Sequence, residues 1–481
     1  MTQPRITMLG SQEASLTSFL DSHPLGHERC AIVLFRRYHS AVSGLEDSDR
    51  YIAVDVILAE DSWVTSSSGA HVAFELKYFR ELFRRCEEES LVFGFVHNHP
   101  GGPTDFSTTD DENEATLVTA IKNRNGPQIH LVALLWSQGI WKARVRAGAS
   151  PQSSESARHV LVIDRPVKIH LNQTGSSDDD LFARQAAAFG QSFVTQLRSL
   201  RVAVVGAGGT GSPTVTLLAR AGVGEIVVID GDKLERSNLN RVRGAGAHDV
   251  GRNKAHILKA YVDGLELPVS VAAFDSYVDV SPQAIDALAT CDVVYGCTDD
   301  QIGREILNTS LYIYAQAYID VGLGGQVSED SFGRPYLRYH FGRISTILPE
   351  SGECLFCQGI LKDVWIRHQY AVRQDPNLTE ANARERYLDH GGEQAPGVGP
   401  FTSAVADYGV ATLFDLVKPF RKFPPEIRPD FFKIDFVRME LRSSQERNNV
   451  ECMYCRQRSY LLKSEEYRLN RPALGKRHAH V

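Results

Sequence analysis

The sequence predicts an α/β protein with two principal domains, the larger built on a mostly parallel sheet. Three observations support this. The chain has 481 residues, which is more than one hydrophobic core usually serves. The apolar run Leu91–Val96 leads directly into two histidines, and a second run, Arg201–Val205, leads into a glycine-rich turn. Short apolar runs that end in polar or glycine-rich segments are typical of buried strands in α/β folds.

Composition narrows the class of protein. Hydrophobic residues make up 43% of the chain and charged residues 23%, as in globular proteins. The net charge of -7 argues against nucleic acid as the main partner. No apolar run has membrane-spanning length, and the first residues lack a signal pattern. We therefore expect a cytoplasmic protein without a membrane partner.

The N-terminal third is expected to be a domain of its own, residues 1–147. We expect strands at Cys30–Phe35, Tyr51–Leu58, Leu91–Val96, Ile129–Leu135 and Ile140–Val145, and a helix at His71–Cys86.

Histidines 97 and 99 lie two residues apart at a strand end, so their side chains point the same way. After a Gly/Pro-rich turn, Ser107 is expected to cap a helix that carries Asp110. Three N/O ligands leave the fourth position of tetrahedral zinc for water, which is the catalytic arrangement. The alternative for a histidine pair alone is a hydrogen-bonded turn, which the full spacing disfavours.

This spacing resembles the JAMM (JAB/MPN) metallopeptidases, which remove ubiquitin or ubiquitin-like tails. The resemblance covers roughly residues 15–147. It implies that His97, His99 and Asp110 bind a catalytic Zn²⁺ and that Ser107 positions or stabilises the oxyanion. It also implies an upstream glutamate as general base. Glu28, just before the first core strand, is favoured over Glu46, which lies in a polar loop.

Residues 148–180 are expected to be a linker because the segment is small, polar and contains proline. Within it, His159–Leu171 is expected to form strands of its own. The helical stretch Leu181–Phe189 then opens the second domain, residues 181–460, and a tail, residues 461–481, follows it.

The second domain is organised around the glycine turn after Arg201–Val205. The next strand, Glu225–Ile229, ends at Asp230, which suits a ribose hydroxyl. Glycines allow backbone amides to approach phosphate at a helix start. This outline also fits a dinucleotide dehydrogenase. The glycines of the turn are Gly206, Gly208, Gly209 and Gly211.

The following segment favours phosphate chemistry. Asn238, Arg241 and Lys254 supply one amide donor and two cations near the turn. Such cations suit an enzyme that neutralises a triphosphate during attack on its α-phosphorus. A further strand, Val293–Cys297, leads to Asp299, a carboxylate suited to Mg²⁺.

Together these motifs resemble the adenylation domain of the ubiquitin-activating/ThiF–MoeB superfamily, over about residues 180–460. The resemblance implies ATP as cofactor, with Asp230 and Asp232 in the nucleotide site. Asn238, Arg241 and Lys254 would hold phosphates and Asp299 would bind Mg²⁺. It also implies an arginine from an N-terminal helix, often reaching across a homodimer, for which Arg184 in Arg184-Gln185 is the candidate.

Four of the eight cysteines form two Cys-x-x-Cys pairs, Cys354/Cys357 and Cys452/Cys455. Four thiolates make a closed structural zinc site, whereas one pair alone could be a redox motif. Members of the superfamily that form a thioester keep their cysteine after the first zinc pair. Here Gln358–Pro400 contains none. The other cysteines are expected in the core, with Cys297 lining the nucleotide pocket.

We therefore predict a bifunctional enzyme. A zinc peptidase would process or remove a ubiquitin-like protein, and an adenylation domain would activate that protein's C-terminal glycine. The adenylate would pass to a separate protein, such as a conjugating enzyme. Similar fusions occur in bacterial ubiquitin-like conjugation operons, some of which serve phage defence. The alternatives are a sulfur-carrier pathway that makes a thiocarboxylate, and a regulatory scaffold with an inactive site.

Overall fold

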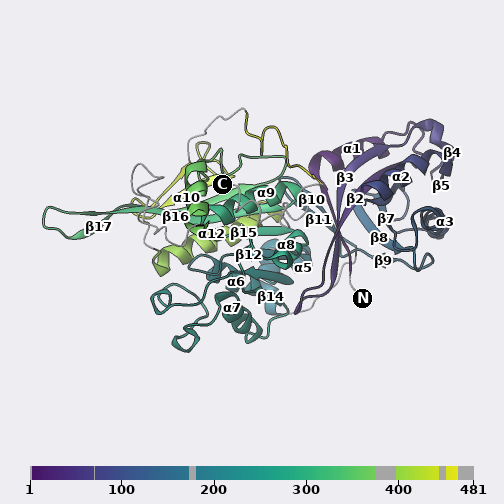
Figure 1. Ribbon diagram of the computed structural model, residues 1–481. Helices are drawn as coiled ribbons and strands as arrows, with labels where there is room; N and C mark the ends of the chain where they lie inside the picture. Colours follow the sequence, from purple (N-terminus) through teal and green to yellow (C-terminus); the bar gives the residue numbers. More distant parts are fainter. Residues whose placement is uncertain (1–2, 70, 173–179, 375–396, 444–450, 464–481) are drawn as a thin grey trace. The chain divides into compact units, whose positions relative to one another are not determined.

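A computed structural model describes residues 3–69, 71–172, 180–374, 397–443 and 451–463 (Figure 1). The chain divides into two compact units. The first comprises Met1–Ala41 and Glu46–Asp178, and the second comprises Val42–Leu45 and Asp179–Val481. Among the described residues, no helix combines the length and the apolar composition that crossing a bilayer requires.

The first unit is built on one sheet with the strand order β11-β10-β1-β3-β2-β6-β7-β8-β9. A two-stranded sheet, β4 (Val64–Ser68) with β5 (His71–Phe74), stands beside it. The strands of the main sheet are β1 (Arg5–Leu9), β2 (Cys30–Ser40), β3 (Ser48–Leu58), β6 (Val92–Asn98), β7 (His130–Ser137), β8 (Ile140–Ala147), β9 (Glu155–Ser156), β10 (His159–Ile163) and β11 (Lys168–Leu171).

Strand β2 shows how the sheet is covered on both faces. Its alternate residues Ala31, Val33 and Phe35 join a core with α1 (Gly10–Leu20). Cys30, Ile32 and Leu34 face the other way, into a core with α2 (Arg80–Glu88) and α3 (Thr108–Asn125). Side chains alternate along a strand, so an unbroken apolar run belongs to a strand buried on both sides.

Two expectations for this unit need correction. Residues 71–86 were expected to be one helix, but they form β5, a short 3-10 helix at Leu76–Phe79 and the start of α2. Val72, Phe79 and Phe83 reach one core from these elements, so burial did not distinguish strand from helix. The segment 148–180, expected to be a linker, contains β9, β10 and β11. They pair within the main sheet, β10 with β1.

The second unit contains an eight-stranded sheet with the order β14-β13-β12-β15-β16-β17-β18-β19. The first five strands in this order pair in parallel and the rest are antiparallel. Their bounds are β12 (Arg201–Val205), β13 (Glu225–Ile229), β14 (Ser270–Phe274), β15 (Val293–Gly296), β16 (Ala317–Glu329), β17 (Pro335–Ile347), β18 (Phe431–Asp435) and β19 (Glu440–Ser443).

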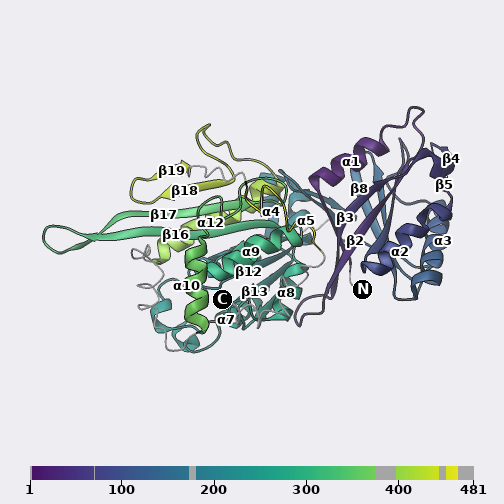
Figure 2. The same ribbon diagram turned by 45° about the horizontal axis from the view of Figure 1, so that its top comes forward.

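The described α-helices of this unit are α4 (Ala183–Phe189), α5 (Gln191–Ser199), α6 (Gly211–Arg220), α7 (Lys254–Asp263), α8 (Pro282–Ala289), α9 (Gln301–Ile313), α10 (Asp363–Gln374) and α12 (Gly399–Val417). The predicted strands Arg201–Val205 and Glu225–Ile229 are confirmed as β12 and β13. Both are fully buried, as the parallel strands of an α/β sheet are. The antiparallel hairpin of β16 and β17 extends well beyond the parallel strands (Figure 2).

Candidate functional site

The glycine turn joins β12 to α6 as predicted. Gly206 has a φ of +93°, and a Cβ there would lie 2.6 Å from the carbonyl oxygen of Cys297. A Cβ at Gly211 would lie 1.7 Å from the Gly206 carbonyl oxygen. A Cβ at Gly208 would meet no atom within 4 Å among the described residues, its two chain neighbours aside. Gly206 and Gly211 therefore permit the tight turn, while Gly208 leaves its backbone open to a ligand.

The turn borders a cavity of about 1230 Å³ at the carboxyl ends of the parallel strands. Ligands in open α/β sheets bind at this edge. The predicted nucleotide-site residues that line it are Gly206, Gly208, Gly209, Asp230, Asp232, Asn238, Arg241, Lys254 and Asp299, and Cys297 lines it too.

Two predicted residues lie elsewhere. Gly211 does not line the cavity, because it begins α6 packed against Gly206. Arg184 is exposed on α4 and is also absent from the lining. Its neighbour Gln185 donates from Nε2 to the Ala221 carbonyl at 3.0 Å, which ties α4 to the end of α6.

The acidic side of the cavity is held by hydrogen bonds within the chain. Asp230 accepts backbone N–H bonds from Ala207 and Asp232, while burial raises the pKa of Asp230. Lys254 Nζ lies 2.9 Å from Asp232 Oδ2, and the Tyr277 hydroxyl donates to Asp232 Oδ1 at 2.6 Å. Although burial opposes it, these two contacts lower the pKa of Asp232. Lys254 is thus held by a carboxylate at the cavity wall.

Arg241 differs from Lys254 in its partners. Its Nη1 donates to the Ser237 carbonyl at 3.0 Å and to Asn240 Oδ1 at 3.3 Å. Within the described part of the chain, it forms no ion pair with a carboxylate. Its side chain lies against the glycine turn, since a Cβ at Gly209 would be 3.1 Å from Arg241 Cδ. An arginine without a counter-ion beside a glycine turn is a fitting donor for phosphate.

The turn after β15 carries two adjacent acids with different roles. Asp300 caps α9, accepting from the Gly303 N–H at 2.6 Å and from the Thr298 hydroxyl. Asp299 is exposed and makes no hydrogen bond within the described residues, so it is the carboxylate available to a cation. Burial raises the pKa of Cys297 to about 12, which keeps this thiol neutral.

Sequence reasoning missed several residues that line the cavity. Tyr277 follows β14, and Arg304 lies one turn into α9. Arg343 and Lys433 come from β17 and β18, far along the chain. Position at a strand end was a usable signal for Tyr277. No local sequence pattern marks Arg343 and Lys433, the two cations on the antiparallel strands.

In the first unit, β6 and α3 bring the predicted metal ligands together. His97 Nε2 lies 3.0 Å from Asp110 Oδ1, and His99 Nε2 lies 3.4 Å from Asp110 Oδ2. All three side chains are buried. The His99 Nδ1 contact with the Pro103 carbonyl at 3.0 Å leaves Nε2 to face the other ligands. Burial alone would lower the pKa of His99, but Asp110 and this carbonyl raise it.

The geometry fits zinc. Ligand atoms about 2.0–2.1 Å from a tetrahedral zinc ion are about 3.4 Å from one another. The two contacts above match this spacing. The 3.0 Å approach of His97 to Asp110 lacks hydrogen-bond geometry, and neither ring nitrogen of His97 has a hydrogen-bond partner among the residues that the structure describes. Buried polar atoms are normally satisfied, so these atoms fit ligands of a common ion.

Glu28 is the predicted base that reaches this cluster. Its Oε1 lies 3.8 Å from His99 Nε2, it is 3% exposed, and burial raises its pKa. Glu46 instead forms an exposed ion pair with Arg158 at 2.6 Å. Asn98 holds the Glu28 segment, accepting from the Arg29 N–H at 2.8 Å and donating to the Leu20 carbonyl at 2.8 Å. The sequence analysis gave Asn98 no role.

Ser107 caps α3 as expected. Its hydroxyl and its backbone N–H both donate to Asp110 Oδ2, at 2.8 and 2.6 Å. These bonds fix the carboxylate that faces the two histidines. The expected role of Ser107 toward the oxyanion stays a prediction.

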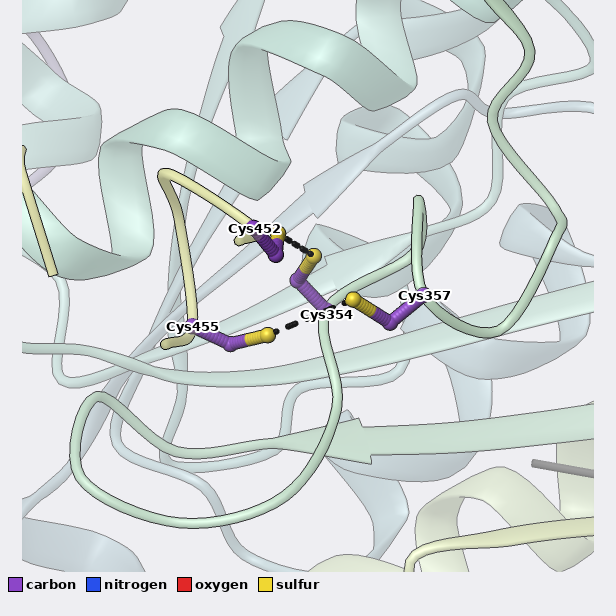
Figure 3. Close-up of side chains that lie close together, drawn as sticks. All are labelled: Cys354, Cys357, Cys452 and Cys455. Atoms are coloured by element: carbon purple, nitrogen blue, oxygen red, sulfur yellow. Dashed lines mark hydrogen bonds between the residues drawn. The ribbon is translucent and has the colours of Figure 1, made fainter. Parts of the chain in front are cut away.

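The four predicted zinc cysteines meet in one cluster (Figure 3). Cys354 Sγ lies 3.5 Å from Cys452 Sγ, and Cys357 Sγ lies 3.5 Å from Cys455 Sγ. Sulfurs about 2.3 Å from a tetrahedral zinc ion would be about 3.8 Å apart, whereas a disulfide needs about 2.05 Å. The cluster therefore fits a structural zinc site with four cysteine ligands. The remaining cysteines, Cys30, Cys86, Cys291 and Cys297, are buried.

Comparison with known proteins shows which families the two domains match. The ThiF family matches residues 182–454, more than half of the chain. The chain belongs to the ThiF family. Residues 20–146 match the prokaryotic homologs of the JAB domain, so the chain joins a JAB domain to a ThiF domain.

Curated relatives match within the ThiF domain. The SAMP-activating enzyme E1 of Haloferax volcanii is 45% identical over 113 residues, covering 24% of this chain and 42% of that protein. The probable adenylyltransferase/sulfurtransferase MoeZ of Mycobacterium tuberculosis is 33% identical over 124 residues, covering 26% and 31%. The chain thus spans less than half of the length of these relatives. A solved structure of E. coli MccB aligns with a TM-score of 0.43 at 19% identity, covering 59% of this chain and 76% of that one.

Proposed function

We propose that the ThiF domain binds Mg-ATP and adenylates the C-terminal glycine carboxylate of a ubiquitin-like or sulfur-carrier protein. The observation that carries this proposal is the cavity itself. Its lining brings together Gly208, Arg241 and Asp299, and within the described residues neither of these two charged side chains forms an ion pair. The printed names of the relatives, an activating enzyme and an adenylyltransferase, support the same chemistry.

The reaction follows from these positions. A carboxylate oxygen of the carrier attacks the α-phosphorus of ATP, the bond to pyrophosphate breaks, and acyl-adenylate and pyrophosphate form. Asp230 would hold the ribose, and Asn238, Arg241 and Lys254 would hold phosphate oxygens. To reach phosphate, Lys254 must share or leave Asp232. Fixed cations stabilise the charge that builds up during transfer. Magnesium, held by Asp299, would neutralise part of the triphosphate charge.

We further propose that the adenylate passes to a separate protein. Gln358–Pro400 contains no cysteine, and Cys297 is buried with its pKa raised to about 12. The acceptor is either the cysteine of a conjugating enzyme or a sulfur donor. A scaffold with an inactive site is the remaining alternative. The complete charged lining of the cavity weighs against it for the ThiF domain.

Carrier-dependent ATP–pyrophosphate exchange tests the adenylation. Exchange should require a carrier that ends in glycine and should fall by about a hundredfold or more in Arg241→Ala and Asp299→Ala. The matched control is Arg236→Ala, since Arg236 is exposed nearby but does not line the cavity. Exchange that persists in both cavity variants contradicts the proposal. So does its absence with every candidate carrier.

We also propose that the JAB domain is a zinc peptidase acting on the same carrier. Zinc held by His97, His99 and Asp110 would acidify its bound water to a pKa of about 7. Glu28 would take the proton of the attacking water and return it to the leaving amine. The raised pKa of Glu28 suits this exchange near neutral pH. Glu28 also lines a cavity of about 250 Å³, whose lining does not include the three proposed metal ligands.

Cleavage of a linear carrier fusion tests the peptidase. Wild type should release the extension after the terminal glycine, whereas His97→Ala and Glu28→Gln should not. Glu46→Gln is the matched control, because Glu46 is the other glutamate that the sequence left open. Equal cleavage by wild type and His97→Ala, or loss in Glu46→Gln but not in Glu28→Gln, counts against the assignment.

Three expectations from the family resemblance complete the proposal. Arg184 would act in the site of a second copy, as its exposed place on α4 permits. Sedimentation of the chain should then show a homodimer, and mixing Arg184→Ala with Arg241→Ala chains should restore part of the exchange. A conjugating-enzyme gene beside this one would favour modification over sulfur transfer. A role in phage defence predicts fewer plaques on a host that carries the active operon.

A further inference from the structure

Asp320 is a fully buried carboxylate on β16 that sequence reasoning did not single out. Three groups converge on it. Arg343 Nη2 donates to Oδ1 at 2.5 Å, the Tyr318 hydroxyl donates to Oδ2 at 3.1 Å, and Arg304 Nε lies 3.4 Å from Oδ2. Burial alone would raise the pKa of Asp320, but the two guanidinium groups lower it. The carboxylate therefore stays charged between two cations that line the nucleotide cavity.

Both ends of this cluster meet the turn that carries Asp299. Arg304 Nη2 donates to the carbonyl of Thr298, the residue before Asp299. The Tyr318 hydroxyl covers Gly296, where a Cβ would lie only 2.4 Å from that oxygen. In the sheet, Gly296 is also the register partner of Asp320. The turn is thus contacted by Arg304 and Tyr318. Asp320 is the counter-ion of Arg304 and the hydrogen-bond acceptor of Tyr318.

Arg343 is fixed by the same carboxylate. It lies across Gly322, where a Cβ would be 2.5 Å from Arg343 Nη2. The missing side chain at Gly322 therefore lets this guanidinium reach Asp320 along the cavity wall. Arg304, by contrast, also faces the charges of Asp299 and Asp300. If Asp320 lost its charge, the nearest remaining anion for Arg304 on this wall would be the Asp299–Asp300 pair.

We propose that Asp320 is a positioning residue of the nucleotide site, which holds Arg304 away from Asp299 so that this carboxylate is available to the divalent cation. The inference rests on the proposed function, because that proposal assigns Asp299 to Mg²⁺. Asp320 is fully buried and is not among the residues that line the nucleotide cavity. Its effect should therefore appear in the cation dependence of nucleotide binding, not in nucleotide binding as such.

Calorimetric titration of the full chain with ATP tests this without any carrier, once with Mg²⁺ and once with EDTA. In wild type, Mg²⁺ should tighten ATP binding. In Asp320→Asn, this Mg²⁺ effect should shrink by about tenfold or more, the size of an ordinary coupling between two sites. The affinity in EDTA should stay within about threefold, because the groups that contact Asp320 are Arg343, Tyr318 and Arg304 and include neither the glycine turn nor Arg241.

The matched control is Glu225→Gln. Glu225 is buried and paired with buried Arg201 at 2.8 Å, at the strand ends opposite the cavity. This variant should lose stability as Asp320→Asn does, yet keep the wild-type Mg²⁺ effect. If Asp320→Asn does not fold, Tyr318→Phe removes one hydrogen bond to the same carboxylate and should weaken the Mg²⁺ effect by about threefold.

The outcomes separate the two proposals. The role of Asp320 alone is overturned if Asp320→Asn or Tyr318→Phe keeps the full wild-type Mg²⁺ effect. It is also overturned if Glu225→Gln loses this effect as much as Asp320→Asn does. Missing carrier-dependent exchange in a chain that still binds Mg-ATP overturns the proposed adenylation alone. If the ATP affinity of wild type does not depend on Mg²⁺, the assignment of Asp299 to Mg²⁺ and the role of Asp320 are both overturned.

Discussion

Replacing Gly208 by alanine should separate ATP binding from folding. Its two chain neighbours aside, no atom of the described part of the chain lies within 4 Å of a Cβ at Gly208, and the φ of Gly208 lies outside the positive range that disfavours side chains. The substitution should therefore leave the free energy of unfolding within about 1 kcal/mol of wild type, with a small gain possible from a stiffer unfolded chain. The added methyl group instead enters the cavity, where the turn's amides would approach a phosphate.

The expected binding loss follows from that displaced contact. A hydrogen bond to a charged group is worth about 1.5–3 kcal/mol, so ATP affinity should fall roughly ten- to a hundredfold. Titration calorimetry with Mg-ATP and urea denaturation of the same sample measure both quantities.

Gly211→Ala is the steric control from the same turn. Its Cβ would lie 1.7 Å from the Gly206 carbonyl oxygen, so α6 must shift. We expect a loss of about 3 kcal/mol, or roughly 6–12 °C in melting temperature. Wild-type ATP affinity in Gly208→Ala would refute a phosphate-binding turn. Melting of Gly208→Ala as low as that of Gly211→Ala would refute the packing argument.

Three further predictions concern the metal sites and the buried thiol. The chain should hold two zinc ions by elemental analysis, of which Cys455→Ser loses one together with stability, because structural zinc contributes folding free energy. His97→Ala should lose the other ion. Cys297 should resist iodoacetamide at pH 8 in the folded chain and react in urea, because burial raises its pKa to about 12 and the folded state keeps the proton. Asn98→Ala should cut carrier cleavage by about ten- to a hundredfold with zinc retained, because Asn98 holds the Arg29 N–H beside Glu28.

The contradicting results are equally specific. A measured content of one zinc ion per wild-type chain would show that one of the two proposed sites does not bind zinc. Alkylation of Cys297 in the native chain at the rate seen in urea would show an open thiol. Loss of zinc in Asn98→Ala would make Asn98 a support of the metal ligands instead of the base.

Local sequence patterns predicted much of the fold. The runs Arg201–Val205 and Glu225–Ile229 were found at their true bounds, because fully buried parallel strands leave no polar position inside the run. Residues 71–86 were misread, because alternating and helical apolar spacings overlap there and feed one core. Strands β10 and β11 were read as strands but placed in a linker. Only the pairing of β10 with β1, and of β11 with β10, shows that they belong to the first sheet.

The candidate sites also combine local sequence patterns with contacts between residues far apart in the chain. The sequence by itself determined the ligand types: His97, His99 and Asp110, the two Cys-x-x-Cys pairs, and the glycine turn with its acids and cations. These are short-range patterns, in which spacing along a strand or turn fixes the direction of side chains. Only the tertiary structure shows that Glu28 lies near His99 while Glu46 pairs with Arg158, because distance along the chain does not give distance in space. Likewise, Asp320, Arg304 and Arg343 meet through strand register and helix packing, a long-range property that no local pattern records.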